Sequence, residues 1–246
     1  MWVSWQNQFP PLFLELFVTL IHALESKVCS LSYIVEICLL FIGFRRSMAS
    51  YKLTYFNMRG RAELARFILA YAGIPYEDIR IEWHNWPSIK PSIPFGKLPV
   101  MEVDGTLINQ SLAIARHLAR DAGLTGKSRL EEAQTDAIVE TLNDFTVLIP
   151  WNEEDEALKK KMIDDLFNNQ APVLLQNLEL LLRDKQWFVG NSVTWADFYW
   201  DICFTTFNVL RKGFADRYPR LQALKDRVEN IPQITEWLKQ RPCTKF

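Results

Sequence analysis

Three short stretches between Tyr55 and Ser111 carry groups that could bind a small anionic molecule. Tyr55 ends a stretch with the pattern of a strand, and its hydroxyl can donate a hydrogen bond to an anion. An X-Pro corner follows at Leu98-Pro99, and a turned backbone there can face a ligand. Gln110-Ser111 opens a predicted helix, whose free amides and partial positive charge suit a carboxylate. The order of these groups indicates a pocket for a small anionic molecule that carries a carboxylate.

Each of these features also has an ordinary structural explanation. A tyrosine on a strand usually packs, an X-Pro bond is usually trans, and a serine at a helix start is usually a cap. Taken alone, Tyr55, Pro99 and Ser111 therefore leave both interpretations open.

Longer motifs around these residues favour the binding interpretation. They read YFNMRGR at 55–61, FGKLPV at 95–100, QSLAIAR at 110–116 and GNSVTWADFYW at 190–200. From about residue 48 to residue 246, the chain resembles the sigma class of glutathione transferases, and within it the branch with prostaglandin D synthase activity. The resemblance implies that glutathione is the cofactor.

The resemblance implies a glutathione site centred on the Tyr55 hydroxyl. Only a thiolate is a strong nucleophile, and a hydrogen bond to the charged form lowers a thiol pKa. Arg61 would add positive charge near the sulfur. The matching positions for catalysis and glutathione binding are Tyr55, Arg61, Trp86, Lys90, Gly96, Lys97, Leu98, Pro99, Gln110, Ser111 and, from the second subunit of a homodimer, Asp144.

The resemblance further implies a hydrophobic acceptor site between two domains. Its matching residues are Met58, Arg59, Trp151, Cys203 and Thr206. The implied reaction is the glutathione-dependent isomerisation of prostaglandin H2 to prostaglandin D2, beside transferase activity toward electrophiles. The acceptor's carboxylate would meet Arg59 or Lys245.

One departure concerns a Ca²⁺ or Mg²⁺ site that the resemblance implies at the dimer interface. The matching positions are Glu140, Asn143 and Asp144, and Asn143 stands where the family has an acid. Hard cations prefer charged oxygen ligands, so we expect no metal.

Hydrophobic periodicity predicts an α/β half followed by an all-α half. A thioredoxin-like domain over 48–126 has the order β-α-β-loop-β-β-α, and an all-helical domain follows over 127–246. Ser111 is expected to cap a helix, Pro172 to kink a long helix over 156–182, and Thr194 and Asp197 to form a capping box. The predicted strands are 52–56, 76–81, 98–103 and 106–109, the segment 83–94 is a loop, and the other helices are 61–71, 111–119, 130–148, 194–210, 219–230 and 233–239.

Residues 1–47 differ from the rest of the chain. Two apolar stretches are interrupted by Glu15 and Glu36, and a central carboxylate costs about 2.5 to 3.5 kcal/mol in a membrane span. We interpret this extension as gene misprediction or an alternative upstream start, with a weak membrane anchor as the second interpretation.

Composition excludes several other classes of function. A net charge of −1 gives no electrostatic reason for a nucleic-acid partner. Four scattered cysteines without a C-x-x-C pair fit a reducing, cytoplasmic compartment and argue against a zinc site.

Two rival functions remain on the same fold. A general sigma-class transferase would conjugate glutathione to electrophiles, whereas a crystallin-like relative would be non-catalytic. Tyr55, Arg61, Gln110 and Ser111 are all present, which favours an enzyme.

Overall fold

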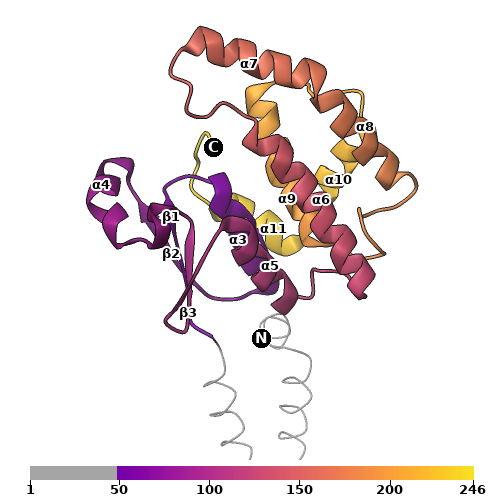
Figure 1. Cartoon of the computed structure of the whole chain (residues 1–246). Helices are drawn as coiled ribbons and strands as arrows, with labels where there is room; N and C mark the ends of the chain where they lie inside the picture. The colour runs from indigo at the N-terminus through magenta and orange to yellow at the C-terminus, as the bar shows by residue number, and fades with distance from the viewer. Residues whose placement is uncertain (1–48) are drawn as a thin grey trace, which may run out of the picture. The chain divides into compact units, whose positions relative to one another are not determined.

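A four-stranded mixed sheet forms the first half of the protein in the computed structural model, which describes residues 49–246 (Figure 1). The strand order is β2-β1-β3-β4, with β1 and β2 parallel and the other neighbours antiparallel. The strands are β1 (Tyr51–Phe56), β2 (Glu77–Ile81), β3 (Val100–Val103) and β4 (Thr106–Asn109). The expectation for residues 1–47 lies outside the described residues. Within 49–246, no helix is both long and apolar enough to cross a membrane.

The predicted hairpin between β3 and β4 is confirmed. Val103 pairs with Thr106, so only Asp104 and Gly105 form the turn. Both turn residues have positive φ, 48° and 81°, as the favoured two-residue hairpin turn requires.

Helix α3 (Glu63–Ala72) is the crossover between the parallel strands. Its predicted apolar face is buried, including Leu64, Phe67 and Ile68. Gly73, at φ 63°, ends the helix in the left-handed conformation that glycine adopts without a Cβ penalty. The 3-10 turn η1 (Gly60–Ala62) lies between β1 and α3 and runs directly into the start of α3.

The segment predicted as a loop before β3 contains short helical turns, so that prediction was wrong in detail. They are η2 (Trp83–Asn85), α4 (Trp86–Ile89), η3 (Lys90–Ser92) and η4 (Pro94–Gly96). Prolines stand at the first position of η4 and at the second positions of α4 and η3, where a missing N–H costs no helical hydrogen bond.

Helix α5 (Ser111–Asp121) begins one residue earlier than a cap at Ser111 would place it. Gln110, at φ 71°, is the N-cap, and Ser111 is the first helical residue. The expectation that Ser111 caps this helix is therefore wrong, because no side chain makes the cap hydrogen bond.

The second half is helical, as predicted. Its helices are α6 (Arg129–Val147), α7 (Glu156–Asn169), α8 (Ala171–Leu182), α9 (Trp195–Leu210), α10 (Pro219–Glu229) and α11 (Pro232–Gln240). The long helix expected over 156–182 is two helices that break at Gln170, and Pro172 lies in the first turn of α8.

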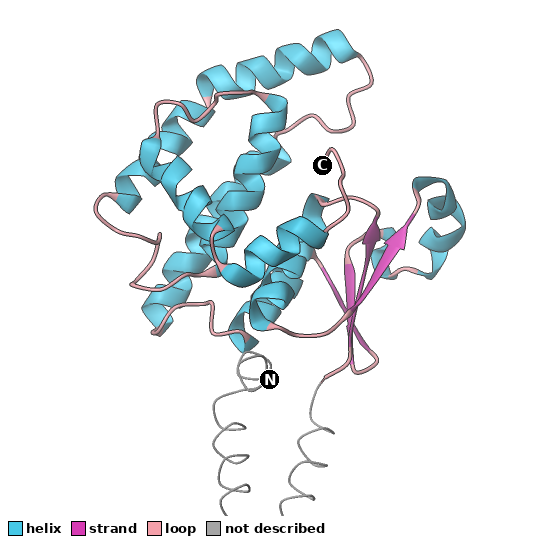
Figure 2. Cartoon of the chain, turned by 180° about the vertical axis from the view of Figure 1, so that it is seen from behind, coloured by secondary structure: helices cyan, strands magenta, loops and turns pink. Residues whose placement is uncertain are grey.

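Helix α9 lies at the centre of the helical half and packs on α3, α6 and α10. It buries Trp195, Phe198 and Trp200, and the predicted capping box of Thr194 and Asp197 begins it. Helices α3 and α5 lie between the sheet and the other helices (Figure 2). The residues that connect β1 to α3 therefore lie near the place where the two halves meet.

Candidate active site

The Tyr55 hydroxyl is oriented as a hydrogen-bond donor. Tyr55 is 7% exposed, and its oxygen accepts a hydrogen bond of 3.2 Å from the Arg61 backbone N–H. Burial raises the pKa of Tyr55, although the Arg61 amide and the charges of Arg61 and Arg66 act in the opposite direction. The phenol therefore keeps its proton at neutral pH and can donate it to a neighbouring sulfur anion.

Gly60 allows this arrangement, and sequence reasoning did not identify it as a site residue. A Cβ on Gly60 would lie 2.7 Å from the Tyr55 hydroxyl oxygen, and the backbone has φ 42°. Both the space and the conformation require glycine. The available signal was the position of Gly60 between a strand tyrosine and a helix start.

Trp86, Lys90 and Gly96, which were predicted to bind glutathione, lie on the helical turns before β3. The Trp86 ring contacts Phe56, the neighbour of Tyr55, with ring centroids 5.3 Å apart. Gly96 has φ 58°, and a Cβ there would lie 3.2 Å from the Lys90 side chain. The backbone at Gly96 thus lets the Lys90 stem pass closely.

The peptide bond at the X-Pro corner, Leu98-Pro99, is cis. Lys97 precedes it in an extended conformation, and β3 follows from Val100. The corner therefore stands at the entrance to the strand that pairs with β1.

The first turn of α5 supplies free backbone donors. Gln110 turns the chain at φ 71°, and its carbonyl accepts from the Ile114 amide at 3.0 Å. The amides of the first helical residues, beginning with Ser111, have no partner within a helix. Such an N-terminus favours a carboxylate.

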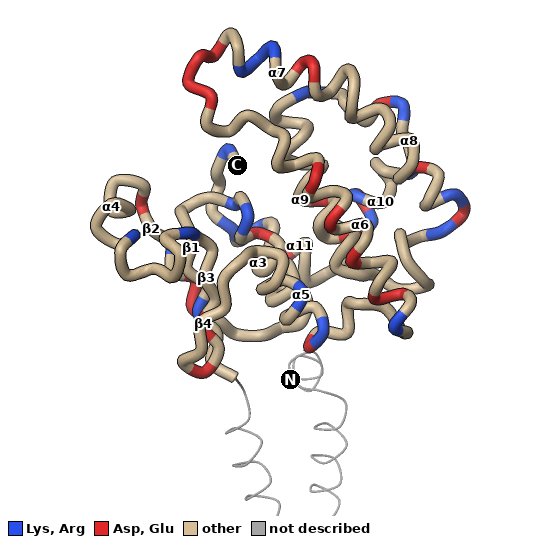
Figure 3. The backbone as a smooth tube through the Cα atoms, in the orientation of Figure 1, with Lys and Arg blue, Asp and Glu red and all other residues tan. Residues whose placement is uncertain are grey.

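On the acceptor side, the structure brings Arg59 and Trp151 together with the end of the chain. The Arg59 amide donates to the Phe246 main-chain oxygen at 2.8 Å, and its guanidinium donates to the Lys245 carbonyl at 2.6 Å. The rings of Trp151 and Phe246 meet edge to face at 5.3 Å. The C-terminal residues therefore pass between the two halves, where basic residues gather (Figures 1 and 3). Met58, beside Arg59, is half-buried.

Cys203 and Thr206 lie on α9, inside the helical half. Cys203 is buried, and burial raises the pKa of its thiol, so this cysteine is a weak nucleophile. The Thr206 hydroxyl donates to the Ile202 carbonyl of its own helix at 3.0 Å.

Tyr199, also on α9, was missed by sequence reasoning because nothing in the local pattern marks it. Its hydroxyl lies 3.4 Å from the Thr146 hydroxyl and donates to the Asn143 side-chain oxygen at 3.5 Å. Burial is the main cause that raises the pKa of Tyr199, so the phenol stays protonated.

Of the three positions considered for a metal, Glu140 and Asn143 have hydrogen-bond partners within the chain. Glu140 accepts from Arg116 at 2.8 Å, and Asn143 accepts from Tyr199. Among residues 49–246, no group of three or more His, Cys, Asp or Glu side chains could hold a metal ion. Asn143 presents a neutral amide oxygen and Glu140 is paired with Arg116, and the expectation of no metal at these positions stays a prediction.

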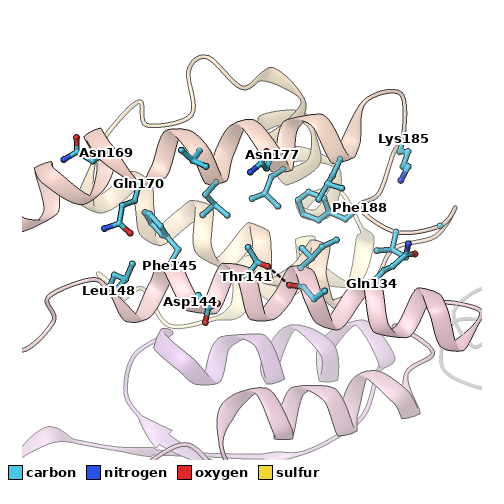
Figure 4. Close-up of a pocket in the computed structure, with 18 residues that line it drawn as sticks. Gln134, Thr141, Asp144, Phe145, Leu148, Asn169, Gln170, Asn177, Lys185 and Phe188 are labelled. Atoms are coloured by element: carbon cyan, nitrogen blue, oxygen red, sulfur yellow. Dashed lines mark hydrogen bonds between the residues drawn. The ribbon is translucent and has the colours of Figure 1, made fainter.

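Asp144 is an exposed residue of α6 and lines a groove between α6 and α8 (Figure 4). The groove has a volume of about 810 Å³. Its apolar lining includes the exposed side chains of Leu148, Val173 and Leu181.

Two family models match most of the described residues. Residues 51–120 match the family model of the glutathione S-transferase N-terminal domain, and residues 143–241 match that of the C-terminal domain. The chain belongs to the glutathione S-transferase family.

Particular relatives within this family are hematopoietic prostaglandin D synthases. That of Gallus gallus is 57% identical over 197 residues, which cover 80% of this chain and 99% of the relative. That of Homo sapiens is 50% identical over 199 residues, which cover 81% of this chain and 100% of the relative. A solved structure of rat hPGDS complexed with a quinoline has a TM-score of 0.78 at 55% identity, covering 80% of this chain and 100% of its own.

Proposed function

We propose that this protein catalyses the glutathione-dependent isomerisation of prostaglandin H2 to prostaglandin D2. It also transfers glutathione to simple electrophiles. The observation that carries the proposal is the protonated Tyr55 hydroxyl, whose oxygen accepts a hydrogen bond from the Arg61 amide. Identity of at least 50% to the named synthases supports it.

The described residues fit glutathione by their chemistry. The Tyr55 hydroxyl stabilises a thiolate, and the amides at the start of α5 hold a carboxylate. Lys90 and Lys97 supply charge for the other carboxylate, and the cis corner at Leu98-Pro99 presents main-chain groups to a peptide. When bound, glutathione supplies the thiol sulfur that attacks the acceptor.

The acceptor binds against Met58, Arg59 and Trp151. Arg59 orients an acceptor carboxylate by charge, while the Trp151 ring provides apolar surface. Cys203 and Thr206 contribute to the floor of this site from α9. Because Tyr55 and Arg59 are four residues apart, one short segment controls both the thiol and the acceptor.

The Tyr55→Phe variant tests this proposal. Removing one hydroxyl donor should lower kcat/KM for prostaglandin D2 formation by about 100-fold or more, because thiolate stabilisation is lost. Binding of glutathione, measured by calorimetry, should change much less.

Two other outcomes have clear meanings. Conjugation of a model aryl halide that depends on Tyr55, without prostaglandin D2, would move the function to general detoxification. Wild-type protein that binds glutathione poorly and catalyses neither reaction would indicate a crystallin-like relative.

We also propose that the protein is a homodimer in which Asp144 completes the glutathione site of the second copy. The support is a carboxylate beside exposed Leu148, Val173 and Leu181, which a second copy of this chain would cover. Asp144→Asn should raise the Kd of glutathione at least about tenfold, because a charge-assisted hydrogen bond is lost. Asp165→Asn, on the exposed face of α7, is the matched control.

Subunit mixing tests whether Asp144 acts across the interface. A Tyr55→Phe subunit paired with an Asp144→Asn subunit has one site with both residues intact only if Asp144 serves the partner. Random mixing makes about half of the dimers heterodimers, each with one intact site of two, so about a quarter of the wild-type activity should then return. No recovery would mean that Asp144 acts within its own chain or that no dimer forms.

We place this protein in the cytosol. The two cysteines within the described residues, Cys203 and Cys243, are unpaired, which is consistent with a reducing compartment.

A further inference from the structure

A fully buried arginine holds the loop that carries the acceptor residues. Arg66, on α3, is 0% exposed. Its Nη1 donates to the Met58 carbonyl at 2.8 Å, to the Arg59 carbonyl at 3.4 Å and to Glu63 at 3.2 Å. Its Nε and Nη2 both donate to Asp78 on β2 at 3.2 Å. The Met58–Arg59 backbone is therefore anchored to a buried charge.

The second charge of this pair, Glu63, holds the end of the helical half. Glu63 is 1% exposed, and its Oε1 accepts from Trp237 Nε1 at 3.0 Å and from Arg241 Nη1 at 2.9 Å. Trp237 lies on α11, and Arg241 directly follows that helix. Lys245 and Phe246, which contact Arg59, begin four positions later.

These contacts close a ring. It runs from the Met58–Arg59 loop through Arg66 and Glu63 to Arg241, along residues 242–246, and back to Arg59. Desolvating such charges is expensive, and apolar side chains of the same volume often give equal stability. Within residues 49–246, the Nε of Arg59 is buried without a hydrogen-bond partner.

We propose that Glu63 and Arg66 are positioning residues of the acceptor site, which couple the C-terminal segment 241–246 to the Met58–Arg59 loop so that both act as one wall. The inference deepens the proposed function and rests on it. Neither side chain touches the acceptor. Their effect passes through Arg59, whose guanidinium and amide both bond the C-terminal segment. The Tyr55 hydroxyl is held by the Arg61 amide, which is outside this ring, so variants that leave Arg66 in place should change glutathione binding little.

Variants at the edge of the ring test the coupling without removing its buried charges. Trp237→Phe deletes one N–H donor and keeps an aromatic side chain. Arg241→Gln removes a partly exposed charge. Each should raise KM for prostaglandin H2 about three- to tenfold, whereas kcat and the glutathione Kd should stay within about twofold. Lys239→Gln, on the exposed side of α11, is the matched control and should change none of these values.

A double-mutant cycle of Arg59→Gln and Arg241→Gln supplies the decisive readout. Direct binding of arachidonate, an unreactive long-chain carboxylate, is measured by calorimetry on the glutathione-loaded full chain. The two effects on its Kd should be non-additive by about fivefold, because the residues act through one ring. Their effects on the glutathione Kd should be additive.

Additive effects on arachidonate binding, or equal losses of glutathione and arachidonate affinity, would overturn the inference and leave a merely structural ring. Failure of the proposed function appears separately, as absence of prostaglandin D2 from the wild-type protein. The arachidonate cycle remains measurable in that case.

Discussion

The chemistry of Tyr55 depends on two neighbours that contribute no side-chain donor. The Arg61 backbone N–H fixes the hydroxyl oxygen at 3.2 Å, and the missing side chain of Gly60 leaves room for it. The hydroxyl proton is thereby left for the ligand. Orientation of a single donor by backbone groups is a common way to stabilise an anion.

Gly60→Ala should reduce activity nearly as far as Tyr55→Phe does. The new Cβ would meet the Tyr55 oxygen at 2.7 Å and displace it, so we expect kcat/KM to fall about 10- to 100-fold. Steady-state kinetics with an aryl halide measures this.

Gly73→Ala is the matched control for backbone strain. Gly73 also has positive φ, 63°, but a Cβ there meets nothing within 4 Å. It should cost about 1 kcal/mol of stability and leave kcat/KM unchanged. Equal activity losses in both variants would show that strain, and not the displaced hydroxyl, is responsible.

At the scale of elements, an aspartate accepts hydrogen bonds at the start of two helices, once at the surface and once in the core. Asp155 caps α7 at the surface through the amides of Ala157 and Leu158. Asp197, the third residue of α9, lies inside the core and accepts from the Phe188 amide and from the amide and hydroxyl of the cap residue Thr194, at 2.7 to 2.9 Å. Burial raises the pKa of Asp197 to about 6, while these donors oppose the rise, so the group is a carboxylate above pH 7.

Asp197→Ala should therefore destabilise the protein far more than Asp155→Ala does. We expect a loss of about 3 kcal/mol or more at Asp197, because buried donors are left unpaired. We expect about 1 kcal/mol at Asp155, the ordinary value of an exposed cap. Urea denaturation above pH 7 gives both values, and similar losses would mean that burial adds nothing to this cap.

Elements with strong local signals could be predicted, while those set by distant contacts could not. The Asp104-Gly105 turn and the alternation in β1 are local, and the structure contains both. The cap at Gln110 was missed because its positive φ is unusual for a side chain of this size. The break at Gln170 was missed because a helical period continues on both sides of it.

At the scale of the whole molecule, α9 carries a second acid, Asp201, in the core. Burial, and then the charge of Glu229, raises its pKa to about 7, and one of its oxygens has no hydrogen-bond partner within residues 49–246. Lys225 and Arg241 act in the opposite direction, and Glu63 adds to the rise. The folded state therefore favours the protonated form.

This raised pKa predicts how stability changes with pH. Below about pH 4 the carboxyl is protonated in both the folded and the unfolded chain. As pH rises from about 4 to about 7, only the unfolded chain releases the proton, so the free energy of unfolding falls, by at most about 4 kcal/mol. Asp201→Asn should flatten this decline and be the more stable protein above pH 7.

Denaturation of both proteins across pH 4 to 8 measures the difference. Asp197 is present in both, so its own titration cancels in the comparison. Parallel curves would mean that Asp201 ionises as easily in the folded chain as in the unfolded one.

The two sides of the candidate site differ in how far the sequence could predict them. The thiol side lies within residues 55–111, so motif and position were enough to propose Tyr55, Pro99 and Ser111. The acceptor side joins Arg59 to Lys245, 186 positions apart, and Glu63 to Arg241, 178 positions apart. No local pattern contains such pairs, because they form only when the helical half packs on α3.

This separation has an evolutionary consequence. The segment 241–246 contacts Arg59 mainly through the main-chain oxygens of Lys245 and Phe246. A residue of any type at these two positions has the same main-chain oxygen. Mutations there can reshape the surface offered to acceptors while the bonds that hold the segment persist. Related proteins can thus acquire new acceptors by mutation of residues 241–246, while the residues that bind the thiol stay unchanged.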